Sequence, residues 1–240
     1  MASNPPGACC AVTNFHEGKA VGSFKTLFGV DSYQTGEAFG NDRVIVILTD
    51  VFGHKYNNVL LVADELAKAK YHVVIPDLFG GDPYTTDNFS DFNAWLPKHT
   101  PDTAKPIVDK FVAELKAAWN PKFLGGIGYC YGGKFAIQQL SEDGHFTAAA
   151  VAHPSFVSIE EVQAVKRPLL ISAAETDSIF TVDLRHQTEV ELTKLGARYQ
   201  LDFFSGVEHG YAVRGDISKP IVKYAKEKTL SDQLVWFAQF

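Results

Sequence analysis

The sequence predicts an α/β fold, with a mostly parallel central sheet and helices on both faces. Short β-branched runs alternate with longer helix-like stretches from about residue 43 onward. These runs are apolar at nearly every position, which is typical of strands buried on both faces of a parallel sheet. With 240 residues, 46% of them hydrophobic, the chain can build a core without disulfides or a structural metal. Function in such sheets lies at the carboxyl ends of the strands, so the residues after each strand are the first candidates.

The first half of the chain predicts two strands and two long helices. Residues 43–49 are nearly all apolar and predict a buried strand. Residues 57–70 carry an apolar stripe at helical spacing. Residues 71–76 predict the next strand. Residues 102–119 predict a helix, which Asn120-Pro121 terminates.

The second half continues the same alternation. Further strands are expected over residues 123–128, 147–151, 168–173 and 199–204. Further helices are expected over residues 132–140, 182–195 and 221–240. Residues 1–22, with Pro5-Pro6-Gly7, predict an irregular lead-in. Nothing within residues 23–240 has the composition of a linker, so this part is predicted to be a single domain.

Composition and charge argue against several classes of function. The formal net charge of −6 disfavours a nucleic-acid-binding face, which needs a basic excess. No apolar run approaches the roughly 20 residues of a membrane-spanning helix. The three cysteines, Cys9, Cys10 and Cys130, predict neither a disulfide framework nor a zinc site, and no histidine spacing indicates a metal. Free thiols without a secretory signal predict a cytoplasmic protein, either a monomer or a homodimer.

One short motif is a candidate for catalysis. Gly128-Tyr129-Cys130-Tyr131-Gly132 follows a predicted strand and begins a predicted helix. This is the pattern of a nucleophile elbow with cysteine in the usual serine position. The glycines leave room for a strained turn, and the helix N-terminus favours a thiolate. The alternative is a buried, inert cysteine in a glycine-rich packing site.

An elbow nucleophile needs a general base and an acid that orients the base, in the chain order nucleophile, acid, histidine. Asp177 follows the fifth predicted strand, with Glu175 as a local competitor, and His209 follows the sixth. Each residue alone could be an ordinary loop side chain, or a helix cap in the case of Asp177. Their order after successive strands predicts a triad of Cys130, His209 and Asp177.

Backbone amides are the candidates for an oxyanion hole. The amide of Tyr131 lies at the predicted helix start, and that of Val51 follows the first predicted strand. Asp50 is expected near Cys130, where a hydrogen bond could hold the thiol until substrate arrives; a strand-end cap is the alternative. The helix dipole and Asp50 act on the thiol in opposite directions, so its resting protonation stays open.

These residues together resemble the dienelactone hydrolase family, from about residue 25 to residue 240. The resemblance is carried by Asp50-Val51-Phe52-Gly53, Pro76-Asp77-Leu78, Gly128-Tyr129-Cys130-Tyr131-Gly132-Gly133, Asp177 and His209-Gly210-Tyr211. Met1-Ala2-Ser3-Asn4 with Cys9-Cys10 is similar to the fungal branch. The resemblance implies an α/β-hydrolase fold, a Cys-His-Asp triad, and hydrolysis of a small ester or lactone without a metal or an organic cofactor.

The chain departs from the family pattern around the expected substrate site. Bacterial members hold the resting thiol with a glutamate, where this chain has the shorter Asp50. Their two carboxylate-binding arginines fall at Gly81 and Val213, with Arg214 one residue later. The natural substrate, and whether dienelactone itself is accepted, therefore stay open.

A substrate pocket is expected near the post-strand positions, although core packing would explain its aromatic residues as well. Its candidate residues are Phe52, His54, Tyr129, His153, Phe156, Tyr211 and Arg214. One alternative function is a non-catalytic protein of this fold that binds a small ligand or a partner. A glucanase ranks lower, because glycoside hydrolysis normally uses paired carboxylates. A thiol redox function lacks a C-x-x-C spacing, and the role of Cys9 and Cys10 stays open.

Overall fold

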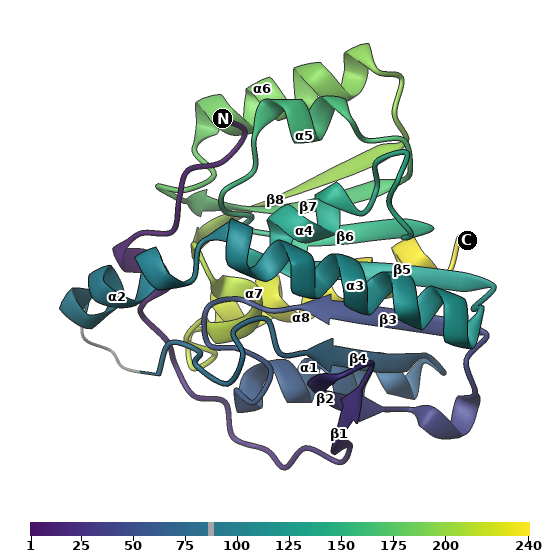
Figure 1. Ribbon diagram of the computed structural model, residues 1–240. Coiled ribbons are helices and arrows are strands. Elements are labelled where there is room, and N and C mark those ends of the chain that lie inside the picture. Colours follow the sequence, from purple (N-terminus) through teal and green to yellow (C-terminus); the bar gives the residue numbers. More distant parts are fainter. Residues whose placement is uncertain (86–88) are drawn as a thin grey trace.

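One eight-stranded sheet forms the centre of the protein (Figure 1). The structure, a computed structural model, describes residues 1–85 and 89–240. The strands are β1 (Ser23–Leu27), β2 (Val30–Thr35), β3 (Arg43–Leu48), β4 (His72–Pro76), β5 (Phe123–Tyr129), β6 (Ala148–Ala152), β7 (Leu169–Thr176) and β8 (Tyr199–Glu208). Their order is β1-β2-β4-β3-β5-β6-β7-β8, with β3 to β8 parallel and the first two strands antiparallel. The predicted mostly parallel sheet is confirmed.

Helices cover both faces of this sheet. The α-helices of the described residues are α1 (Asn57–Lys68), α2 (Phe89–Trp95), α3 (Pro101–Trp119), α4 (Tyr131–Gln138), α5 (Ile159–Gln163), α6 (Val182–Lys194), α7 (Tyr211–Arg214) and α8 (Pro220–Phe237). In Figure 1, α3 and α4 lie in front of the sheet, and α1 and α8 lie behind it. None of the helices described is long and apolar enough to cross a membrane.

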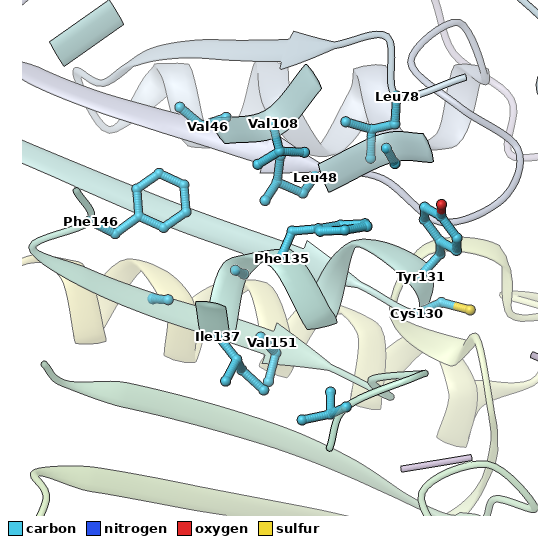
Figure 2. Packing of buried hydrophobic residues seen from close by; sticks show 14 of the residues in the cluster. Val46, Leu48, Leu78, Val108, Cys130, Tyr131, Phe135, Ile137, Phe146 and Val151 are labelled. Atoms are coloured by element: carbon cyan, nitrogen blue, oxygen red, sulfur yellow. The ribbon is translucent and has the colours of Figure 1, made fainter. Parts of the chain in front are cut away.

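Alternation along the parallel strands builds a separate core on each face. Val46 of β3 packs with Val108 of α3 and Phe135 of α4, whereas its neighbour Ile45 packs on the side of α1 and α8. Burying one such aliphatic side chain stabilises the fold by roughly 1.5–3 kcal/mol. Figure 2 shows the first of these cores, with Cys130 at its edge where β5 ends. The two cores therefore hold β5 rigidly from both sides, up to the residue that carries the thiol.

The antiparallel hairpin of β1 and β2 was not predicted from the sequence. Most of β1 is exposed, so it lacks the apolar run that marks the buried strands. The hairpin turns at Phe28 and Gly29, which have φ values of 52° and 80°. Its position at one edge of the sheet explains why its residues carry so weak a signal.

The N-terminal segment, residues 1–22, lies along the carboxyl ends of the parallel strands (Figure 1). The amides of Ala2 and Ser3 donate to the carbonyl oxygen of Val157, and Asn4 pairs with the loops after β6 and β7. Before β1, its helical structure is the single 3₁₀ turn Ala8–Cys10. The irregular lead-in is thus docked on the strand ends, and its separation from the rest as a domain stays a prediction.

Candidate active site

Strand β5 and helix α4 meet in a tight turn at Cys130. Cys130 has φ 50° and ψ −110°, a strained combination for a residue with a side chain. A Cβ atom on Gly132 would lie 2.0 Å from the carbonyl oxygen of Leu48, and one on Gly128 would lie 2.6 Å from the Cα of Gly133. Side chains at these two positions would push the strand and the helix apart. The glycines therefore permit the turn that the elbow pattern predicts.

Two further loops bring an acid and a histidine to this turn. His209, directly after β8, places Nε2 3.2 Å from the Sγ of Cys130. Its Nδ1 lies 2.9 and 3.0 Å from the carboxylate oxygens of Asp177, directly after β7. One of these oxygens also accepts the amides of Ile179 and Phe180, which fixes the carboxylate. The structure thus brings together the three residues that the sequence predicts as a triad.

The local electrostatics favour an ion pair between the thiol and the imidazole. Burial alone would raise the pKa of Cys130, but a hydrogen bond from Cys10 and the positive charge of His209 bring this pKa well below its usual value. Burial alone would lower the pKa of His209, but the negative charge of Cys130 and the hydrogen bond to Asp177 raise it. These directions favour a thiolate and an imidazolium as the resting pair.

Two side chains that sequence reasoning did not place in the site contact the same sulfur. The Sγ of Cys10 lies 3.5 Å from that of Cys130 and 3.4 Å from the Nε2 of His209. The hydroxyl of Ser155 lies 3.3 Å from the Sγ of Cys130. Ser155 follows β6, so its post-strand position was an available signal. Cys10 had no signal beyond its residue type, because the docking of the N-terminal segment is not visible in the sequence.

Asp50 has partners other than the thiol. One of its oxygens lies 3.1 Å from the Nε of Arg214, and the other accepts the amide of Phe52. Arg214 also donates to the carbonyl oxygen of Cys9, at 2.8 Å. Burial raises the pKa of Asp50, and the charge of Arg214 opposes this shift only in part. Among the described hydrogen bonds none joins Asp50 to Cys130, so the expected thiol-positioning contact is not formed in this structure.

The backbone amides predicted for the oxyanion hole lie in adjacent loops. The amide of Gly132 donates to the carbonyl oxygen of Thr49, at 3.0 Å, and so ties the elbow to the loop after β3. Within residues 1–85 and 89–240, the amides of Tyr131 and Val51 have no hydrogen-bond acceptor. These two amides are thus free to donate to another group.

Of the seven predicted pocket residues, His153 and Arg214 lie beside the imidazole, and Phe52 and Phe156 pack on residues next to the site. The ring of Phe52 lies 5.7 Å from the guanidinium carbon of Arg214. The ring of His153 lies 4.9 Å from that of His209, and His153 is fully buried with a φ of 42°. Phe156 is half-buried in the loop after β6. Its ring lies 6.0 Å from the ring of Tyr131, the first residue of α4.

The hydroxyl groups of Tyr129 and Tyr211 point away from the thiol and the imidazole. The hydroxyl of Tyr129 donates to Gln233, and that of Tyr211 pairs with Thr229, so both reach toward α8 on the far side of the sheet. Strand alternation explains the position of Tyr129, because its side chain must leave the sheet on the face opposite to that of its neighbours in β5. The structure therefore uses Tyr129 in the core behind the site, whereas Tyr211 also lines the cavity beside His209 and has its ring 5.9 Å from that of His153.

His54 and the positions of the family's arginines lie apart from the thiol. His54 contacts Asp31 at 3.2 Å and Asp77 at 3.5 Å. Gly81 is exposed with a φ of 87°, and Val213 is buried. Neither of these two positions therefore carries a basic side chain.

A cavity of about 200 Å³ adjoins the imidazole. Cys9, His209 and Arg214 are among the residues that line it. Two groups of side chains have metal-binding atoms within 4.8 Å of one another: one is Cys9, Cys10 and His209, and the other is Cys130, His153 and His209. The site therefore combines a small cavity with an unusual density of thiol and imidazole groups.

The sheet order and the elbow define the protein as an α/β hydrolase. A solved structure from Klebsiella pneumoniae, assigned to the dienelactone hydrolases, has the same fold with a TM-score of 0.77. It is 15% identical in sequence, over 92% of this chain and 99% of that chain. Structural likeness at this identity shows the fold.

Sequence comparison shows the family. The model of the dienelactone hydrolase family matches residues 30–240. Hydrolase pyvD of Aspergillus violaceofuscus is 39% identical over 246 residues, which cover 100% of this chain and 99% of the relative. Hydrolase tropI of Talaromyces stipitatus is 33% identical, over 100% of this chain and 98% of the relative. The chain belongs to the dienelactone hydrolase family and is a hydrolase of esters or lactones.

Proposed function

We propose that the protein hydrolyses small esters or lactones without a cofactor, by covalent thiol catalysis with Cys130, His209 and Asp177. One observation carries this proposal: the Nε2 of His209 lies 3.2 Å from the sulfur of Cys130, and its Nδ1 lies 2.9 Å from Asp177. This spacing connects a nucleophile, a proton carrier and an orienting carboxylate in one line of hydrogen bonds.

The first half of the reaction forms a thioester. The thiolate of Cys130 attacks the carbonyl carbon of the substrate, and the carbonyl oxygen becomes an oxyanion. The amides of Tyr131 and Val51 are proposed to donate to this oxygen; loss of one such donor lowers the rate by about 10²–10³-fold. The tetrahedral intermediate collapses, the carbon–oxygen bond of the leaving group breaks, and the imidazolium of His209 gives its Nε2 proton to the leaving alkoxide.

The second half returns the enzyme to its resting state. His209, now neutral, takes a proton from water, and the resulting hydroxide attacks the thioester carbon. The carbon–sulfur bond breaks and restores the thiolate beside the imidazolium. Asp177 accepts the Nδ1 proton in a hydrogen bond throughout, so it holds the ring in place and stabilises its positive charge. Since thiolate leaves readily, this chemistry suits activated esters and lactones.

The free thiols of the protein indicate the cellular compartment in which it works. Cys9, Cys10 and Cys130 are free thiols in this structure, and we propose that the protein works in a reducing compartment such as the cytoplasm. The proposed substrate is a small molecule, and the proposed assembly is a monomer or a homodimer.

The two alternatives are less well supported by the contacts. Glycoside hydrolysis needs two carboxyl groups facing one bond. Here Asp50 pairs with Arg214, and Asp177 pairs with His209, so neither is free for that chemistry. A purely ligand-binding protein has no need of a thiolate and an imidazolium in contact.

The test is hydrolysis of p-nitrophenyl acetate and a panel of small lactones by wild type, Cys130→Ala and Cys9→Ser. We expect Cys130→Ala to lower kcat/KM by at least about 10³-fold, because the covalent route is lost. Cys9→Ser, which removes the half-exposed thiol, is expected to retain wild-type rates. If Cys130→Ala keeps its activity, thiol catalysis is wrong. If wild type turns over no ester or lactone, the ligand-binding alternative takes its place.

A further inference from the structure

Three donor atoms that soft metal ions prefer meet at one point of the site. The sulfurs of Cys10 and Cys130 lie 3.5 Å apart, and the Nε2 of His209 lies 3.4 and 3.2 Å from them. All three side chains are buried. They come from the N-terminal segment, the elbow and the residue after β8. The proposed hydrolysis uses two of them as reacting groups, and Cys10 takes part only through its hydrogen bond with Cys130.

We propose that Cys10, Cys130 and His209 form a binding site for a thiophilic divalent cation, with Zn²⁺ as the expected ion. Zinc binds thiolate sulfur at about 2.3 Å and imidazole nitrogen at about 2.0–2.1 Å. Neighbouring donors of such a tetrahedron lie roughly 3.5–3.8 Å apart. The three spacings of 3.5, 3.4 and 3.2 Å therefore match one face of a zinc tetrahedron to within a few tenths of an ångström.

The residue behind the imidazole is also the one that a metal site requires. A histidine that binds a metal usually donates its other ring N–H to a carboxylate, which fixes the ring and strengthens the ligand. The Nδ1 of His209 makes this contact with Asp177, at 2.9 Å. The same hydrogen bond turns Nε2 toward the two sulfurs.

A fourth ligand is available within reach. His153 is fully buried, and both of its ring nitrogens lack a hydrogen-bond partner among residues 1–85 and 89–240. One of them lies within 4.8 Å of the donor atoms of Cys130 and His209. An unpartnered imidazole aimed at this cluster is a second, independent sign of a ligand.

Cys9 provides a route from solvent. It is half-buried, it lines the cavity of about 200 Å³ beside His209, and its donor atom lies within 4.8 Å of those of Cys10 and His209.

Metal binding and hydrolysis exclude each other, and this part of the inference rests on the proposed function. The ion takes the lone pair of Nε2 on His209 and a lone pair on each sulfur. The protons on Nε2 and on the thiol of Cys10 leave to water, because metal ligands must be deprotonated. The sulfur of Cys130 is then no longer free to attack a carbonyl carbon, so the metal-bound protein is inactive.

The test uses the full chain, reduced and freed of metal with a chelator, and titrates it with Co²⁺ as a coloured substitute for Zn²⁺. Wild type is expected to bind one equivalent with a thiolate-to-cobalt charge-transfer band, which one equivalent of Zn²⁺ removes. Cys10→Ser and Cys10→Ala are expected to weaken binding by at least about tenfold and to diminish the band, because a direct ligand is lost. Cys9→Ser is the matched control and is expected to keep the affinity and the band at equilibrium.

A second measurement needs no variant. One equivalent of Zn²⁺ is expected to protect Cys10 and Cys130 of wild type from iodoacetamide while Cys9 stays reactive, as read by peptide mass spectrometry. The proposal is overturned if wild type shows no charge-transfer band, if both Cys10 variants bind Co²⁺ as wild type does, or if Zn²⁺ leaves Cys10 unprotected. These readouts involve no ester, so failure of the proposed hydrolysis and failure of the metal site are separable.

Discussion

The elbow, residues 128–133, and the N-terminal segment meet at the sulfur of Cys130 but are held in place in different ways. The elbow is fixed by close packing, since a Cβ on Gly132 would lie 2.0 Å from the backbone of β3. The N-terminal segment is fixed by hydrogen bonds to residues far along the chain, such as those that join Ser3 to Val157 and Cys9 to Arg214. One region depends on steric exclusion, and the other on polar contacts.

This difference sets how each region responds to change. A steric clash with backbone is not relieved by small movements of side chains, so substitutions in the elbow are expected to be severe. A typical hydrogen bond contributes only about 0.5–1.5 kcal/mol, so loss of a single contact leaves the N-terminal segment docked. A residue that takes part in both regions is the most sensitive position.

Arg214 is that residue, because it binds Asp50 below the elbow and the carbonyl oxygens of Cys9 and Val12 in the N-terminal segment. We expect Arg214→Met to lower the free energy of unfolding by about 3–5 kcal/mol, since it leaves a buried carboxylate without a partner. Urea denaturation measures the change. Asp50→Asn combined with Arg214→Met is expected to recover part of it; equal stability of the single and double variants would show that the unpaired charge is not the cause.

The stability of Gly132→Ala tests steric exclusion in the elbow, and a glycine of the N-terminal segment provides the comparison. We expect a loss of about 3 kcal/mol, because the added methyl group meets the carbonyl oxygen of Leu48. The matched control is Gly7→Ala in the N-terminal segment. Gly7 has a φ of −130°, and its Cβ would make an ordinary contact at 3.5 Å, so we expect a change within about 0.5 kcal/mol. Similar losses for the two variants in thermal unfolding would contradict this distinction.

The reactivity of Cys130, where the two regions meet, is expected to depend on pH. The pKa of Cys130 is lowered, so its thiolate is present above that pKa and is lost as the pH falls through it. We expect His209→Gln to move the rise of Cys130 alkylation to higher pH, because the positive charge that favours the thiolate is removed. At pH 7 the rate with iodoacetamide should fall roughly tenfold. Both proteins carry Cys9→Ser, which removes the other reactive thiol; an unshifted profile would refute the ion pair.

Ser3→Ala tests a single polar contact of the N-terminal segment. The buried hydroxyl of Ser3 accepts the amide of Val157 at 2.8 Å, and alanine leaves this amide without an acceptor. We expect a loss of about 1 kcal/mol in urea denaturation. Ser23→Ala, at an exposed position of β1, should cause almost none. A loss above about 3 kcal/mol would mean that the segment is held more rigidly than its hydrogen bonds imply.

The sequence predicted those parts of the fold and site whose cause is local or topological. Gly128 and Gly132 indicated the elbow because small residues at that spacing have a steric reason. Asp177 and His209 were found because parallel strands end at one edge of the sheet, so chain order alone places post-strand residues together. Six parallel strands were predicted from their apolar runs, and the structure extends the last two to Thr176 and Glu208.

What the sequence did not predict depends on contacts between distant segments. The pairing of Asp50 with Arg214 required helix α7, which follows β8, to reach the loop after β3. The inward position of Cys10 required the N-terminal segment to cross the strand ends. Tyr129 points to the face of the sheet that lies away from the thiol. That direction depends on the register of β5, because a shift of one residue reverses the face of every side chain in a strand. None of these has a signature in a single stretch of residues.

The separation of the site residues along the chain also sets the order in which the site forms. Strand β5, the elbow and α4 are contiguous, and their contacts close short loops. The contact between Cys10 and His209 spans 199 positions, and closing so long a loop costs more chain entropy and slows folding. The elbow therefore assembles early, and its sulfur is covered only when the two ends of the chain have docked. The contact between Cys10 and Cys130 therefore marks the last step of folding rather than the first.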